Sequence, residues 1–113
     1  MIRSLRLLAA AALLQSHAFA AAPAETYAVP AEVWDHPRSA RAMLGQPAIG
    51  EAVRAYLARP GRKLAIHYAA GQEPLLYAEE LRSWLIALGI ESGDIALSPD
   101  RNRGEPLTLE VRP

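Results

Sequence analysis

The chain has 113 residues, 51% of them hydrophobic and none of them cysteine, and its 12 basic and 12 acidic side chains give a formal net charge of zero. The lack of cysteine excludes disulfide scaffolding, thiolate metal sites and lipid attachment through cysteine. The balanced charge provides no electrostatic basis for binding nucleic acid or an anionic membrane.

The first 20 residues have the three parts of a cleavable secretory signal peptide. Two early arginines precede an uninterrupted apolar run, 7–14, and small residues stand at Ala18 and Ala20, so that cleavage is expected after Ala20. The alternative is a membrane anchor, but Gln15 ends the apolar run well short of the roughly 20 residues that a spanning helix needs. We therefore expect export to the periplasm, with no stable membrane insertion after cleavage.

The exported part is expected to form one domain, residues 27–113, after an Ala/Pro-rich disordered lead, residues 21–26. Its first segment, 27–34, contains Pro30, which has no backbone N–H to donate to a neighbouring strand. We therefore predict an edge strand or an irregular extended segment. Trp34, next to that edge, is a candidate partner-binding residue because a tryptophan there can be partly exposed.

Two helices are predicted next. Asp35 is expected to cap a short helix that runs through Pro37 to Leu44 and is broken by Gly45. Pro47 then opens a longer helix, since proline suits the first turn. Four apolar residues of this helix recur at offsets of four, seven and eight, which places them on one face: Ile49, Val53, Tyr56 and Leu57.

A strand and a second long helix follow. Residues 63–68 (KLAIHY) predict a largely buried strand with Ile66 on one face and His67 on the other. The helix is expected to start near Pro74 and to stop at Gly89, which can adopt the left-handed conformation. Its apolar stripe consists of Tyr77, Leu81, Trp84, Leu85 and Leu88.

The end of the chain predicts a hairpin. A short strand at 94–97 is followed by turn-forming residues 99–104 and by alternating apolar residues at 107, 109 and 111. Arg101 and Arg103 on the hairpin tip are candidate partner contacts, although alternating charges on a turn usually serve only solvation. The whole pattern predicts an α+β fold of order β-α-β-α-β-β, with two helices on one face of a mixed sheet.

His67 is the most notable polar residue. It is expected at the C-terminal end of a parallel strand, where open sheets form ligand crevices, with Tyr68, Gln72 and Glu73 close in sequence. The alternative is a half-exposed strand histidine that is hydrogen-bonded to a loop. No metal or other cofactor is expected, because a zinc site needs three or four ligands and only one other histidine, His36, remains after cleavage. No serine has the glycine-flanked setting of a catalytic nucleophile, so we expect no enzyme.

Residues 49–95 resemble the OmpA-like peptidoglycan-binding domain of bacterial cell envelopes, and the last strand, Leu109-Glu110-Val111, is similar to that family's closing strand. The resemblance is carried by Tyr56, Leu57, Pro60, Leu64, Ile66, Ala78, Leu81, Trp84, Leu85, Gly89, Ile90 and Ile95. It implies the fold above. It also implies a ligand site in which a carboxylate after the second strand and an arginine in the next helix grip the diaminopimelate of a peptide stem.

Those binding residues are replaced in this chain. Tyr77 stands where the arginine would lie, and Ala69-Ala70-Gly71 stands where the carboxylate would lie. Leu107-Thr108 replaces an arginine pair at the start of the last strand. The resemblance therefore argues for the fold more than for the activity.

Three functions remain open at this point. The leading expectation is a non-enzymatic periplasmic module that binds a partner protein of the cell envelope. The second is peptidoglycan binding through altered polar contacts, drawn from His67, Tyr68, Gln72, Glu73 and Tyr77. The third is a small hydrolase, which requires His67, Glu73 and another acid to converge.

Overall fold

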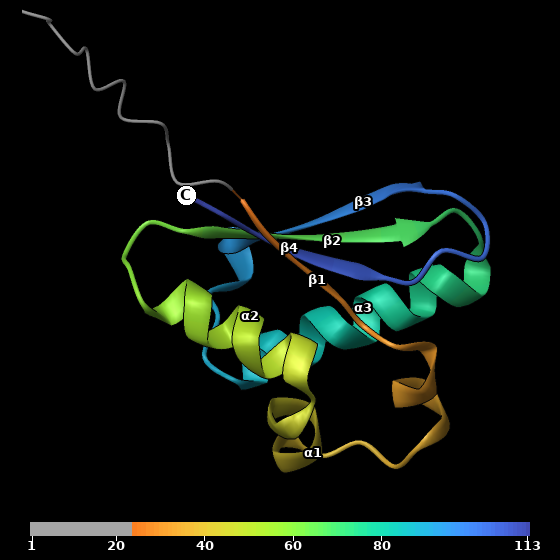
Figure 1. Ribbon diagram of the computed structural model, residues 1–113, viewed down its shortest axis with the longest axis horizontal. Coiled ribbons are helices and arrows are strands. Elements are labelled where there is room, and N and C mark those ends of the chain that lie inside the picture. The colour runs from red at the N-terminus through yellow and green to blue at the C-terminus, as the bar shows by residue number, and fades with distance from the viewer. Residues whose placement is uncertain (1–23) are drawn as a thin grey trace, which may run out of the picture.

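The computed structural model describes residues 24–113, so the expected signal peptide and the start of the expected lead lie outside the described residues. The helices cover one face of a four-stranded sheet and leave the other face open (Figure 1). The predicted α+β class, with two main helices and a mixed sheet, is confirmed.

The elements are β1 (Glu25–Ala28), the 3₁₀ helix η1 (Ala31–Asp35), α1 (Ala40–Gly45), α2 (Pro47–Leu57), β2 (Lys63–Ala69), α3 (Gln72–Ala87), the 3₁₀ turn η2 (Ser92–Asp94), β3 (Ile95–Arg101) and β4 (Thr108–Arg112).

The strand order is β1-β4-β2-β3, which makes the predicted terminal hairpin wrong. β3 pairs in parallel with β2, whereas β4 lies between β1 and β2 and is antiparallel to both. Burial of apolar side chains favours this central position of β4. Leu109 and Val111 lie over the helices in a strand with neighbours on both sides, and they are only 0% and 2% exposed. β3 is also longer than expected and runs through Pro99, which an edge strand tolerates because one side of its backbone has no strand partner.

β1 is the edge strand expected in segment 27–34, but it begins at Glu25, two residues before the expected start of the domain, and ends at Ala28. The rest of that segment is not extended as predicted, because residues 31–34 belong to the 3₁₀ helix η1. Trp34 does not lie on that edge. It belongs to η1, which follows β1 and passes down beside the helices (Figure 1).

The cap of the first short helix differs from the prediction. Ser39 caps α1, and its Oγ accepts a hydrogen bond from the backbone N–H of Ala42 at 3.0 Å. Asp35 instead ends η1, so the expected Asp35 cap is wrong. The cause is Pro37, since a residue before proline avoids the helical conformation and His36 is extended, with φ −113° and ψ 155°. A helix can therefore begin no earlier than Pro37, so Asp35 cannot be its cap.

The hydrophobic core lies between the sheet and the helices. In α2, Ile49 and Val53 are buried as predicted, but Leu57 is 60% exposed. At 3.6 residues per turn, an offset of eight places Leu57 about 80° around the helix from Ile49, and it is the last helical residue. The largest fully buried side chains are Val29, Met43, Ile49, Leu64, Ile66, Leu81, Leu85, Ile90 and Leu109. None of the helices within residues 24–113 is long and apolar enough to span a membrane.

Candidate functional site

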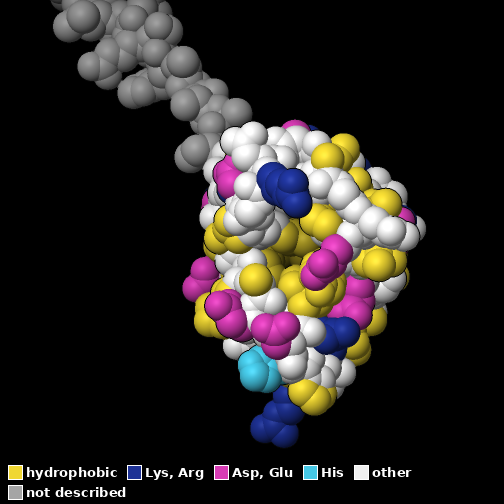
Figure 2. Space-filling model, turned by 90° about the vertical axis from the view of Figure 1, so that its right-hand side faces the viewer, with side chains coloured by type: hydrophobic (Ala, Val, Ile, Leu, Met, Phe, Trp, Pro, Cys, Tyr) yellow, Lys and Arg dark blue, Asp and Glu magenta, His cyan; other side chains and the backbone are white. Residues whose placement is uncertain are grey.

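An open cleft of about 720 Å³ lies at the end of the sheet where β2 leads into α3. Its walls are the segment after β1, the first turns of α3, and the loop 102–107 that joins β3 to β4. Figure 2, which faces this end of the molecule, shows a hollow with hydrophobic side chains at its base and acidic side chains around it. This mixture of an apolar base and a few polar groups is typical of ligand sites.

A glycine makes the sharp turn at the base of the cleft. Gly71 has φ +137°, a backbone conformation that side-chain-bearing residues rarely adopt, and it caps the start of α3. The chain therefore reverses directly after β2. Tyr68, 8% exposed at the end of that strand, and Gln72 and Glu73 in the first turn of the helix are all brought to the cleft.

Two aromatic rings form one wall. Trp34 of η1 stacks on Tyr77 of α3, with ring centroids 4.9 Å apart and an angle of 6° between the planes. The guanidinium of Arg38 lies 5.7 Å from the Trp34 ring centroid and donates a hydrogen bond of 2.8 Å to the Trp34 carbonyl. Arg38 also forms an ion pair with Glu80 of α3, Nε to Oε2 2.6 Å. These contacts hold the segment after β1 against α3.

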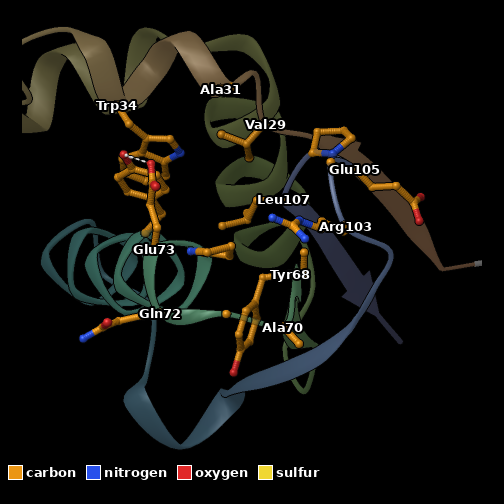
Figure 3. A pocket seen from close by; sticks show the side chains of 16 residues that line it. Val29, Ala31, Trp34, Tyr68, Ala70, Gln72, Glu73, Arg103, Glu105 and Leu107 are labelled. Carbon is orange, nitrogen blue, oxygen red and sulfur yellow. Dashed lines mark hydrogen bonds between the residues drawn. The ribbon is translucent and has the colours of Figure 1, made fainter.

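The cleft carries opposite charges on two of its walls. On α3, the Tyr77 hydroxyl donates a hydrogen bond of 2.9 Å to Glu73, and this bond is the main reason that the pKa of Tyr77 is raised. On the loop 102–107, Arg103 is exposed and forms no ion pair with any residue in 24–113, whereas Arg101 pairs with Glu105 at 2.8 Å. Figure 3 shows the Arg103 side chain directed into the cleft and the Glu105 carboxylate directed away from it.

Six residues that the sequence analysis singled out separately line this one cleft: Trp34, Tyr68, Gln72, Glu73, Tyr77 and Arg103. Two others do not. His67 and Arg101 line a shallower pocket of about 310 Å³ on the open face of the sheet. Successive side chains of a strand point to opposite faces, so the neighbours His67 and Tyr68 are necessarily separated.

His67 joins three strands on the open face. Its Nδ1 lies 2.8 Å from both carboxylate oxygens of Asp100 in β3, and its Nε2 lies 2.8 Å from Glu110 in β4. Burial of the ring would lower the pKa of His67, but hydrogen bonds to Glu110 and Asp100 outweigh it and raise the pKa above its ordinary value. The bond to His67, followed by the bond to Arg112, lowers the pKa of Glu110.

Sequence reasoning missed both partners of His67. The alternative considered for His67 was a hydrogen bond to a loop, whereas its partners Asp100 and Glu110 are strand residues. One signal was present, because alternation with Leu109 assigns Glu110 to the face opposite the core. That signal becomes useful only once β4 is known to lie beside β2.

Neither a metal site nor the catalytic group of a hydrolase is formed by the described residues. Within 24–113, no three His, Cys, Asp or Glu side chains are grouped so that they could hold a metal ion. Glu73 lines the cleft and His67 lines the pocket on the opposite face, so the convergence required by the hydrolase interpretation is not found.

Comparison of the chain with known protein families, with curated proteins and with solved structures found no match.

Proposed function

We propose that the chain is a non-enzymatic binding module of the bacterial cell envelope, with a degenerate OmpA-like fold, and that the cleft is its ligand site. The element order and the helices on one face of the sheet agree with the fold that the sequence resemblance implies. The cleft follows the second strand, which is also where the resemblance places the ligand. The N-terminal sequence supports export to the periplasm.

The observation that carries the proposal is the convergence of three separate segments on one cleft. Trp34 comes from the segment after β1, Glu73 and Tyr77 come from α3, and Arg103 comes from the loop 102–107. A carboxylate accepts hydrogen bonds from an ammonium group, and a guanidinium donates two parallel hydrogen bonds to a carboxylate. The cleft is thus suited to a peptide-like ligand that carries both groups.

The opposite charges favour one source of such a ligand, the peptide stem of peptidoglycan, over a segment of an envelope protein. A stem that ends in a diamino acid offers a zwitterionic group, which needs one anionic and one cationic partner. In this chain Glu73 on α3 supplies the anionic partner and Arg103 on the loop supplies the cationic one, while Tyr77 occupies the position of the family's arginine. The two charged partners that the resemblance implies for the ligand are thus supplied in this chain by residues at other positions.

Retention on purified sacculi tests the peptidoglycan ligand. We expect the mature protein to co-sediment with sacculi, and Glu73→Gln and Arg103→Ala each to reduce retention at least fivefold, since each removes one charge-assisted contact of about 1–3 kcal/mol. Glu79→Gln and Arg59→Ala are matched controls at exposed positions outside the cleft. They should leave retention unchanged. No retention of the unsubstituted protein would exclude this ligand.

Cross-linking tests the cleft independently of the ligand's source. A photoreactive amino acid placed at Ala31, an exposed residue that lines the cleft, should capture peptidoglycan or an envelope protein in intact cells. The same probe at Glu79, outside the cleft, is the control. Equal cross-linking from both positions would refute the cleft as the binding site.

A further inference from the structure

The hydrogen bonds of His67 define its protonation state. Nδ1 and Nε2 each lie 2.8 Å from carboxylate oxygens, those of Asp100 and Glu110 respectively. An ionised carboxylate only accepts hydrogen bonds, and a neutral imidazole has a single N–H. Both contacts can therefore be hydrogen bonds only when the ring is an imidazolium.

Deprotonation must break one of the two contacts, and the structure indicates which. The Asp100 side chain is 56% exposed and, among the described residues, has His67 as its only ion-pair partner. The Glu110 side chain is 21% exposed and is also held by Arg112 at 2.9 Å. Water can replace the imidazole at Asp100 at small cost, so the bond to Asp100 is the one expected to break.

Asp100 lies two residues before the loop 102–107, which forms a wall of the cleft. The parallel pairing of β2 with β3 shifts register between His67 and Ala69, so the end of β3 is irregularly paired. Arg101, which follows Asp100 in β3, forms an ion pair with Glu105. Glu105 also accepts a hydrogen bond of 2.8 Å from the backbone N–H of Asn102. A side-chain contact from β2 to Asp100 therefore helps to hold the end of β3 and the loop 102–107.

We propose that His67 is a pH-sensitive clamp on the cleft: its imidazolium holds the end of β3 and the loop 102–107, and its deprotonation loosens the wall that carries Arg103. The part of the proposal that concerns the loop is independent of any ligand. Its consequence for binding rests on the proposed function.

The charged groups around His67 determine where on the pH scale the ring loses its proton. β3 contributes Asp100 and Arg101, and β4 contributes Glu110 and Arg112; Lys63, on the same strand as His67, is paired with Asp94. β1 contributes only the uncharged Thr26 to this pocket. The pKa of His67 is raised from its ordinary value of 6.5, so the clamp is expected to release above that pH.

Amide hydrogen exchange and the NMR titration of the His67 ring test the clamp without a ligand. Between pH 5.5 and 8.5, after correction for the intrinsic pH dependence of exchange, the protection of amides in 102–105 should fall about two- to fivefold, as expected when an exposed charged pair is lost. The change should follow the titration of His67. Loop protection that is unaffected by this titration would overturn the proposal.

Three variants complete the test. His67→Gln and Asp100→Asn should each abolish the pH transition of the loop, and the second variant covers the case in which the first does not fold. His36→Gln, at the other histidine of the described residues, should retain the transition. A transition that persists in His67→Gln would refute the clamp.

Sacculi retention at pH 5.5 and 8.5 separates the clamp from the proposed function. Stronger retention at the lower pH would support both. A loop transition without retention at either pH would refute peptidoglycan binding and leave the clamp supported.

Discussion

The stacked rings of Trp34 and Tyr77 should be energetically coupled. Their centroids are 4.9 Å apart, their planes are nearly parallel, and both side chains are mostly buried. Such a pair contributes about 0.5–1.5 kcal/mol beyond the burial of its area. Burial of most of either ring adds about 1–2.5 kcal/mol, somewhat less than the value for a fully buried side chain. Trp34→Ala and Tyr77→Ala should each lower the free energy of unfolding by roughly 1.5–4 kcal/mol.

A double-mutant cycle isolates the coupling. The double variant should be destabilised by about 0.5–1.5 kcal/mol less than the sum of the single variants, because the stack can be lost only once. Urea unfolding should be followed by circular dichroism at 222 nm, since removing Trp34 alters the fluorescence signal. Tyr77→Phe is the control: it keeps the ring, removes only the exposed bond to Glu73, and should change stability by less than about 0.5 kcal/mol. Additivity of the two alanine substitutions within about 0.3 kcal/mol would refute the stacking contribution.

Three further predictions concern stability. Ser39→Ala should cost about 1 kcal/mol through loss of the α1 cap, whereas Asp35→Ala should remain within about 0.5 kcal/mol, and equal effects in urea unfolding would contradict the cap assignment. Leu109→Ala, at a fully buried position of an interior strand, should cost about 2–5 kcal/mol and Leu57→Ala, at an exposed one, less than about 1 kcal/mol, measured in the same way. Because the folded-state pKa of His67 is raised, its contribution to stability is fully present below the unfolded pKa of 6.5 and is lost as pH rises through the folded value. His67→Gln should flatten the stability profile in that window, and an unchanged profile would contradict this assignment.

The elements with a clear period could be predicted because the period follows from burial on one side. Leu81 and Leu85, four apart on α3, are fully buried, and so is Leu109 in the alternating last strand. The period does not predict which strand lies beside which. A strand with one buried face has the same alternation whether it pairs with the preceding strand or lies between two others, so the pattern at 107–111 carried no information about the position of β4.

The candidate site was predictable where it is local. Tyr68, Gln72, Glu73 and Tyr77 lie around a single turn, and their nearness in sequence is sufficient to bring them together. Arg103 comes from a distant loop, and no local pattern indicates that it faces the same cleft. The separation of His67 from Tyr68 followed from the alternation already assigned to β2, yet nearness in sequence was given more weight than strand geometry.

The cleft and the contacts of His67 with Asp100 and Glu110 both result from the strand order. Because β4 lies between β1 and β2, the loop 102–107 must pass the end of β2 to reach it, and this crossing places Arg103 at the cleft. The same position puts Glu110 on the strand beside His67. In a hairpin of β3 and β4 at the edge of the sheet, β3 would separate Glu110 from His67, and the loop would turn back without passing the end of β2. A clamp on one face can therefore act on a cleft on the other, because one strand connection builds both.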